Sequence, residues 1–289
     1  MEDSAGKSLL VVAVVAILGI GLGVAGSQGG AALAGVPLFG AAVAVAFILQ
    51  WVIFLPSFFL RTERFFDLTG SFTYLAITLA LALLTPAADA RTWVLAAMVS
   101  VWALRLGTFL FRRVERVGKD SRFDQIKQSA PRFLSVWTIQ ALWVSVTASA
   151  AWIAITSTVR VALDGWAAAG VLLWLIGFGI EAVADAQKNR FKADPANAGQ
   201  FIRTGLWSRS RHPNYFGEIV LWVGVLVVTV PVLQGWGWVA VISPIFVTVL
   251  LLRVSGIPLL EAKADATWGG QSEYEAYKSA TPVLVPKLV

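Results

Sequence analysis

The stretch SLLVVAVVAILGIGLGVA, residues 8–25, decides the class of fold, because 18 consecutive residues carry no charged side chain. An apolar run of this length is typical of a helix that crosses a membrane. Further windows of the same kind cover 33–60, 70–86, 92–111, 133–157, 165–187, 217–234 and 236–253. The pattern predicts an all-α polytopic membrane protein, a bundle of seven or eight transmembrane helices.

The composition excludes an ordinary soluble domain. Of the 289 residues, 57% are hydrophobic and 14% are charged, with a mean hydropathy of +0.74, whereas soluble domains carry about 25% charged residues. Glu2 and Asp3 before a single Lys7 make a poor signal-peptide start, so the first window is interpreted as a retained span. We assign 1–60 to N-terminal transmembrane helices and 61–289 to the membrane domain that carries the function.

The residue inventory also limits the chemistry. The chain has no cysteine and one histidine, which excludes disulfides, thiolate nucleophiles and most metal sites, so no metal is expected. The net charge of +6 indicates cytoplasmic loops or an anionic ligand in so apolar a chain, and no nucleic-acid partner is expected.

Basic residues gather on one side of the predicted bundle. The loop 112–132 carries seven basic and three acidic residues, which places it in the cytoplasm by the positive-inside rule. The basic stretch 188–211, Arg253 and the segment 61–64 are an even number of spans away, so they join the same face. The pattern predicts an integral membrane protein whose site opens to the cytoplasm; membrane topology alone explains the same asymmetry.

Ionisable residues inside apolar spans are candidates for function because their burial is costly. Arg105 lies within the fourth span and requires an anionic partner or ligand, unless it snorkels to the interface. At the end of the sixth span, polar residues recur every three or four positions and share one helix face. They are Glu181, Asp185, Lys188, Asn189 and Lys192. Such a face suits ribose hydroxyls, an amide and phosphates, or it is a solvated helix end with ordinary ion pairs.

Two residues near the third span are candidate acids. Glu63 precedes the span, and a carboxyl near an apolar cavity can hold its proton. Tyr74, inside the span, could donate a hydrogen bond to a developing oxyanion. A salt-bridged loop residue and a core phenol are the alternative readings.

The strongest local motif is TGLWSRSRHPNYFGE, residues 204–218. Pro213 holds the preceding residue extended, and a helix that begins there would direct its free N–H groups toward the same space as Arg209 and Arg211. This combination is typical of an anion site. Glu218 could accept a hydrogen bond from an amide or a ribose.

The motif resembles the signature of bacterial membrane proteins related to the steroid 5-alpha-reductase family. The segments 63–71 and 118–124, with Tyr274 and Tyr277, support the resemblance over roughly 60–289. It implies NADPH-dependent reduction of the C4–C5 double bond of 3-oxo-Δ4 steroids or a related enone lipid. The resemblance extends to sterol C14 reductases and isoprenylcysteine-type methyltransferases, which share the Arg-His-Pro-x-Tyr turn.

Candidate site residues follow from the resemblance and from the polar patterns together. The cofactor candidates are Arg105, Asp120, Arg122, Glu181, Asp185, Lys192, Arg211, His212, Asn214, Tyr215, Glu218 and Arg253. The catalytic candidates are Glu63 and Tyr74. Animal members have a Glu two residues before the Pro of a Gln-Glu-Leu-Pro stretch; Phe54 stands there in this chain, so Glu63 is the substitute.

Two other functions stay open. An S-adenosylmethionine-dependent lipid methyltransferase would use the same turn, although the many arginines favour phosphates. A transporter or scaffold is the third class, but we find no internal repeat that would favour it. Expected partners are an enone lipid substrate and membrane lipids, with no obligate protein partner.

Overall fold

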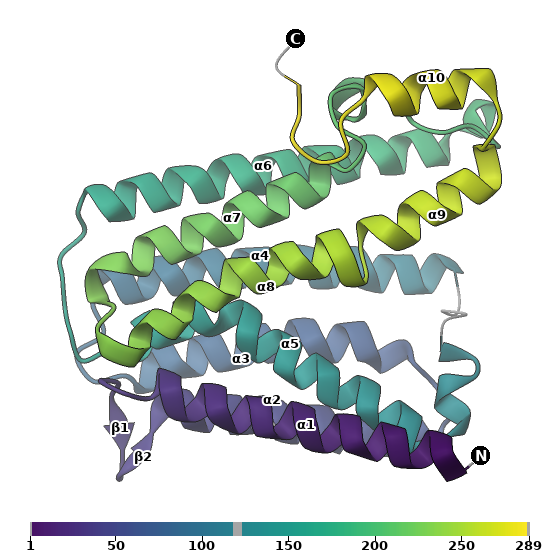
Figure 1. Ribbon diagram of the computed structural model, residues 1–289. Coiled ribbons are helices and arrows are strands. Elements are labelled where there is room, and N and C mark those ends of the chain that lie inside the picture. Colours follow the sequence, from purple (N-terminus) through teal and green to yellow (C-terminus); the bar gives the residue numbers. More distant parts are fainter. Residues whose placement is uncertain (1, 118–122, 288–289) are drawn as a thin grey trace. The chain divides into compact units, whose positions relative to one another are not determined.

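The computed structural model describes residues 2–117 and 123–287, with side chains for 5–109 and 123–287. It is 79% helical and has one short antiparallel hairpin, formed by β1 (Ala32–Leu33) and β2 (Val36–Pro37) (Figure 1). The helices are α1 (Glu2–Gly26), α2 (Leu38–Phe59), α3 (Arg64–Leu84), α4 (Ala90–Val117), α5 (Ala130–Thr156), α6 (Gly165–Ala193), α7 (Pro213–Thr229), α8 (Ile242–Val249), α9 (Ile257–Trp268) and α10 (Ser272–Ala280). Short 3₁₀ segments cover Ile126–Gln128, Pro195–Asn197, Gly205–Ser208, Val230–Val232 and Gly235–Val241, and a π-helical turn covers Leu250–Val254.

Eight helical segments within the described residues are long and apolar enough to cross a membrane. They run over Ala5–Gly26, Leu38–Phe59, Arg64–Leu84, Ala90–Phe109, Ala130–Thr156, Gly165–Ala193, Pro213–Val232 and Gly235–Trp268. The all-α polytopic membrane fold predicted from the sequence is therefore confirmed. Of the two predicted counts, length and composition support eight.

Two predicted windows differ from the structure in a way that hydropathy does not detect. The window 33–60 begins too early, because the hairpin occupies its first residues; Gly35, at a φ of 79°, makes the turn, and α2 begins at Leu38. The window 236–253 is not one regular helix, since it contains a 3₁₀ segment, α8 and the π-helical turn. Hydropathy counts apolar residues and does not detect such breaks.

The chain forms two compact units. Unit 1 comprises Met1–Ala167 and Val228–Ser243, and unit 2 comprises Ala168–Val227 and Pro244–Val289. In unit 1, α5 contacts α1, α2, α3 and α4, and 78% of an apolar 18-residue window of α5 is buried, against 28% of the corresponding window of α1. The buried part of α5 is rich in Ala, Ser and Thr, small residues that let membrane helices approach closely.

A buried arginine fixes one end of unit 1. Arg91, 2% exposed, donates hydrogen bonds to the carbonyls of Val161, Ala162 and Val228 and forms an ion pair with Asp164 at 3.1 Å. The hydrogen bond from Ala167 N–H, with Arg91 beside it, lowers the pKa of Asp164. The arginine thereby joins the start of α4 to the loop between α5 and α6.

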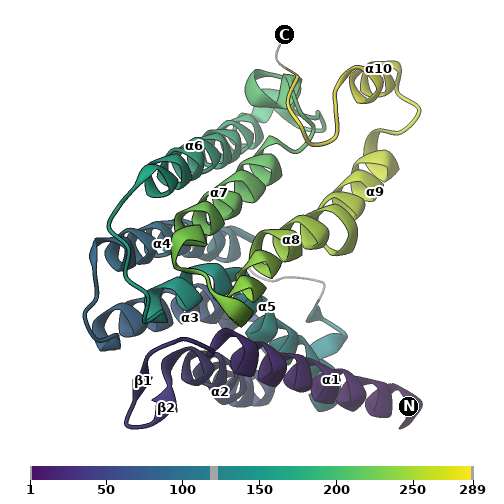
Figure 2. The same ribbon diagram turned by 60° about the vertical axis from the view of Figure 1, so that its left-hand side comes forward.

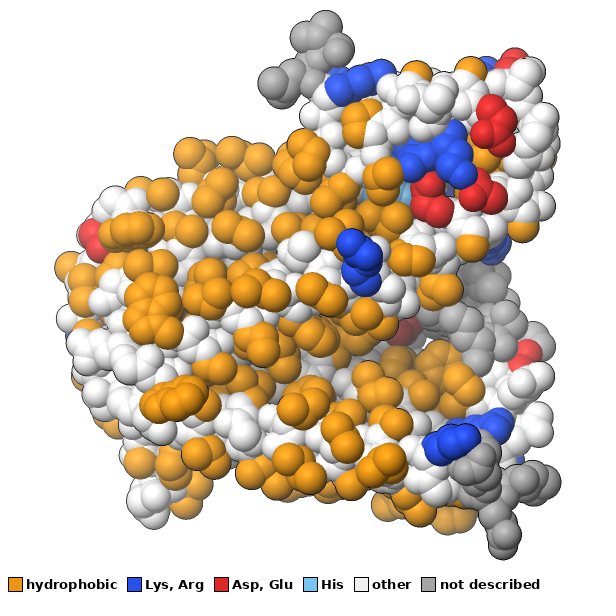
Figure 3. All heavy atoms as spheres, viewed as in Figure 1, with side chains coloured by type: hydrophobic (Ala, Val, Ile, Leu, Met, Phe, Trp, Pro, Cys, Tyr) orange, Lys and Arg blue, Asp and Glu red, His pale blue; other side chains and the backbone are white. Residues whose placement is uncertain are grey.

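In unit 2, glycines bring α6 and α7 into backbone contact. A Cβ atom on Gly177 would lie 2.5 Å from the carbonyl oxygen of Gly217, and one on Gly217 would lie 2.7 Å from the backbone nitrogen of Glu181. The two helices run side by side in both ribbon views (Figures 1 and 2). Charged side chains of unit 2 gather over the end of α9 and over α10, on the face drawn in Figure 3.

Candidate functional site

The predicted turn opens α7 in unit 2. The segment 205–208 forms a 3₁₀ turn, and α7 begins at Pro213, where a missing N–H costs nothing. Gly205 has a φ of 62° and lies against Gln187 of α6, whose Oε1 accepts a hydrogen bond from the N–H of Leu206 at 2.9 Å. The turn is thus joined to the end of α6.

Glu261 of α9 binds two consecutive residues of the motif, Arg211 and His212. Its Oε1 lies 2.8 Å from Nε2 of His212, and its Oε2 lies 3.1 Å from a terminal nitrogen of Arg211. Burial lowers the pKa of His212, and the hydrogen bond to Glu261 opposes that shift only in part. The His212 ring also stacks on Tyr215, with 5.8 Å between ring centroids. Within unit 2, therefore, Arg211 and His212 already have an anionic partner.

The segment 282–287 closes over the turn as a strap. The N–H of Arg211 donates to the carbonyl of Pro282 at 2.9 Å, and the N–H of Lys287 donates to the carbonyl of Arg209 at 3.0 Å. The Ser210 hydroxyl donates to the carbonyl of Leu284 at 2.8 Å. These bonds satisfy backbone groups that a loop at this position would otherwise leave to water.

Tyr277 adds a second fastening between the C-terminal segment and the turn. Its hydroxyl donates to the carbonyl of Trp207 at 2.7 Å, and burial raises its pKa to about 12, so it stays protonated. Trp207 is itself 3% exposed and donates through Nε1 to the carbonyl of Ala184 at 3.0 Å. The tyrosine thus reaches α6 through the indole.

The polar face of α6 lies beside this turn. Glu181, 5% exposed, lies with its backbone against Gly217 at the start of α7. Two turns later, the ammonium of Lys188 lies 4.5 Å from the centroid of the Trp207 ring. Asp185, half-buried, lies on the turn between them, and Lys192 is exposed one turn beyond. The structure therefore places Glu181 and Lys188 of α6 beside the motif.

Three further predicted cofactor residues have different positions in unit 2. Asn214 and Glu218 lie on the first turns of α7 and are half-buried. Arg253 is exposed on the π-helical turn. Each carries a hydrogen-bonding group that a ligand could reach.

The candidates of unit 1 are described separately. Glu63 is 8% exposed and forms an ion pair with Lys127 at 2.7 Å; this carboxylate raises the pKa of Lys127. Tyr74 is 4% exposed and packs edge-on against Trp102, with 5.1 Å between ring centroids. Eleven residues of helix separate the two candidates, a rise of about 16 Å. Arg105 is half-buried on α4.

Two predictions lie outside the described residues, namely Asp120 and Arg122. Among the residues that the structure does describe, no group of three or more His, Asp or Glu side chains could hold a metal ion.

Sequence reasoning missed Glu261 and gave the strap no role. Glu261 follows the apolar run Ile257-Pro258-Leu259-Leu260 and lies 49 residues from His212. Its only local signal is a single acidic residue in an apolar helix turn, which resembles an ordinary helix end.

Comparison with known proteins places this chain in a family. A family model described as "Protein of unknown function (DUF1295)" matches residues 53–281. An uncharacterized protein of Schizosaccharomyces pombe, C594.04c, is 26% identical over 163 residues, which cover 47% of each chain; this chain thus spans about half the length of that relative. No solved structure is significantly similar. The chain belongs to the DUF1295 family, a steroid 5-alpha-reductase-like family of membrane proteins.

Proposed function

We propose that this protein is an NADPH-dependent reductase that saturates the carbon–carbon double bond of an enone lipid, with 3-oxo-Δ4 steroids as the model substrates. The family supports a reductase-like membrane enzyme. The observation that supports NADPH as the cofactor is the polar face of α6. There, Glu181 and Lys188 lie against the turn that opens α7.

The donor set of unit 2 fits the two ends of NADPH. The carboxylates of Glu181, Asp185 and Glu218 would accept hydrogen bonds from ribose hydroxyls or from the nicotinamide amide. The amide of Asn214 could either donate to or accept from the same groups. Lys188 and Lys192, one to three turns nearer the end of α6, would hold the phosphates. When bound, NADPH supplies the hydride that the β carbon of the enone accepts; a proton at the α carbon completes the reduction.

Tyr74 is the proposed donor of the hydrogen bond that polarises the ketone. Glu63 forms an ion pair with Lys127 at 2.7 Å, and an ionised carboxylate only accepts hydrogen bonds, so in this pair it would not act as an acid toward a ketone. The Tyr74 phenol can donate a hydrogen bond to the ketone oxygen without ionising. We therefore keep Tyr74 as the proposed donor and treat Glu63 as the weaker candidate.

One observation favours the methyltransferase as a second candidate. Glu261 already pairs with Arg211 and His212, so the turn offers fewer cations to a phosphate than its sequence suggests. S-adenosylmethionine has no phosphate and would not need them. The cofactor experiment therefore includes it.

Cofactor binding separates the two candidates. We would titrate the detergent-purified full chain with NADPH, NADH and S-adenosylmethionine and follow the melting temperature, since a ligand that binds only the folded state raises it. Stabilisation by NADPH supports the reductase, and stabilisation by S-adenosylmethionine alone overturns it. Turnover of progesterone or testosterone, measured as the saturated ketone by mass spectrometry, then tests the reaction.

A matched pair of variants locates the cofactor. Lys188→Gln removes a cation from the polar face of α6, whereas Arg190→Gln removes one from an exposed position two residues along the same helix. A charge-assisted hydrogen bond contributes about 1.5–3 kcal/mol, so Lys188→Gln should raise the Kd for NADPH by about tenfold or more. Equal effects of both variants would place the phosphates elsewhere.

A further inference from the structure

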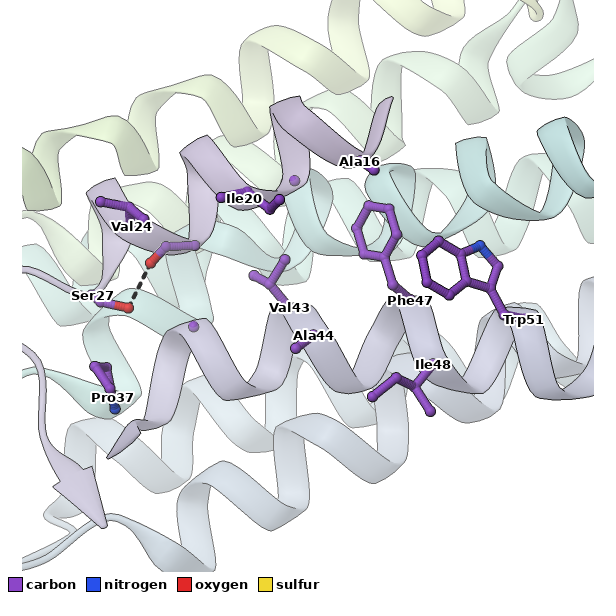
Figure 4. Close-up of a pocket in the computed structure, with 13 residues that line it drawn as sticks. Ala16, Ile20, Val24, Ser27, Pro37, Val43, Ala44, Phe47, Ile48 and Trp51 are labelled. Atoms are coloured by element: carbon purple, nitrogen blue, oxygen red, sulfur yellow. Dashed lines mark hydrogen bonds between the residues drawn. The ribbon is translucent and has the colours of Figure 1, made fainter. Parts of the chain in front are cut away.

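An apolar groove runs along the seam between α1 and α2 in unit 1 (Figure 4). Its volume is about 570 Å³. It begins near the hairpin, at Ser27 and Pro37, and ends at Ala16 and Trp51. Fourteen residues of α2 give it a length of about 21 Å. Both helices are candidate membrane spans, so the groove lies at hydrocarbon depth. Residues 1–52 also lie outside the family match.

Small residues form the floor of the groove and larger ones its walls. A Cβ atom on Gly23 would lie 3.7 Å from the Cα of Gly40, so the two backbones approach closely at the floor. The walls stand out from the bundle: Ile20 is 66% exposed, Val24 is 63% exposed and Ile48 is 54% exposed. The hollow is therefore open to the bilayer along its length.

The polar groups of the lining are already satisfied. The hydroxyl of Ser27 donates to the carbonyl of Gly23 (Figure 4), and Nε1 of Trp51 donates to the hydroxyl of Thr138 at 3.0 Å. Both side-chain donors are therefore in use, and neither is left for a ketone oxygen. The lining thus fits a plain hydrocarbon better than the oxygenated substrate proposed above.

The volume of the groove indicates which hydrocarbon group fits it. A cavity of about 150 Å³ takes one benzene ring, or about 25 Å³ per carbon, so this groove holds about twenty carbons. That is one long acyl chain. A helix about 10 Å across and of the same length needs more than 1,000 Å³, so a helix of a second copy could cover the groove but could not fill it.

We propose that the groove is a binding site for one acyl chain of a bilayer phospholipid. Residues 27–37 at its hairpin end contain no charged side chain, so nothing there selects a headgroup. Outside the groove the acyl chain would lie in bilayer hydrocarbon, which is as apolar as the lining of the groove. Shape, not hydrophobicity, therefore provides the preference.

Native mass spectrometry of the full chain tests the site. After reconstitution in nanodiscs of phosphatidylcholine or phosphatidylglycerol and release, one phospholipid should remain bound per chain, to a similar extent for both lipids. Ala44→Phe places a ring in the groove and should lower that occupancy at least tenfold. Val45→Phe, on the same helix but outside the groove, is the control and should retain the lipid.

A second pair of variants tests the same site in case the Phe variants misfold. Ile20→Ala removes a wall of the groove, whereas Ile17→Ala truncates a residue that is also 66% exposed but does not line it. Only the first should lower lipid retention. Any of four results would overturn the proposal. The natural chain retains no lipid, all variants retain it equally, only one headgroup is retained, or lipid is bound only to dimers.

Discussion

Glu261 and His212 lie 49 residues apart in sequence and are joined by a 2.8 Å hydrogen bond, with Arg211 held by the other oxygen of the same carboxylate. One side chain of α9 thereby orients two consecutive residues of the turn that opens α7. The motif therefore depends on a residue that is not part of it.

Glu261→Gln should lower the melting temperature of the protein. The change leaves Arg211, 12% exposed, without its anionic partner, and the loss of such a hydrogen bond costs about 1–3 kcal/mol. Glu273→Gln is the control, because it breaks an ion pair with Arg203 whose side chains are 69% and 49% exposed and which contributes little. Equal shifts for the two variants would show that Glu261 does not hold the turn.

Stability should fall as the pH drops below about 6.5, the ordinary value for a histidine. Because burial lowers the pKa of His212 in the folded state, the unfolded chain binds more protons in this range, and stability then rises with pH. His212 is the only histidine of the chain. Melting temperatures between pH 8 and pH 5.5 should show the fall, and His212→Gln should reduce it. An undiminished fall in that variant would assign it to another group.

Gly177→Ala should destabilise unit 2, while Gly179→Ala on the same helix should not. A Cβ on Gly177 would meet the carbonyl of Gly217 at 2.5 Å, whereas one on Gly179 meets nothing within 4 Å. Overpacking of this kind costs about 1–3 kcal/mol. Thermal unfolding in detergent checks the difference, and equal melting temperatures would mean that α6 and α7 adjust at no cost.

Tyr74→Phe should spare NADPH binding and slow enone reduction by about a hundredfold, as expected when one oxyanion donor is removed. Cofactor titration and steady-state turnover measure the two effects. A fully active variant would exclude the phenol as the donor.

Two variants distinguish a catalytic role of Glu63 from a structural role of its ion pair with Lys127. Glu63→Gln and Lys127→Met both break the bond between these residues. If Glu63 only holds the loop before α3, the two variants should lose activity and melting temperature alike. A much larger loss of turnover in Glu63→Gln, at equal melting temperature, would make Glu63 a catalytic acid and contradict our preference for Tyr74.

The spans were predictable because each one is a local property of about twenty residues. The start of α7 was predictable too, since Pro213 determines it locally. The irregular last span was not, because residues 236–252 carry no charged side chain and hydropathy does not detect the π-helical turn at Leu250–Val254. The pairing with Glu261 was equally hidden, because contacts across 49 residues depend on how helices pack.

The strap has a consequence for biosynthesis. Pro282 is synthesised 71 residues after Arg211, to whose N–H its carbonyl bonds; at about 5–20 residues per second, the delay is about 4–14 s. During that interval the turn is in place on the ribosome-bound chain without its last hydrogen-bond partners. A chain that terminated between residues 269 and 281 would therefore keep all eight candidate spans yet lack the hydrogen bonds that close the turn.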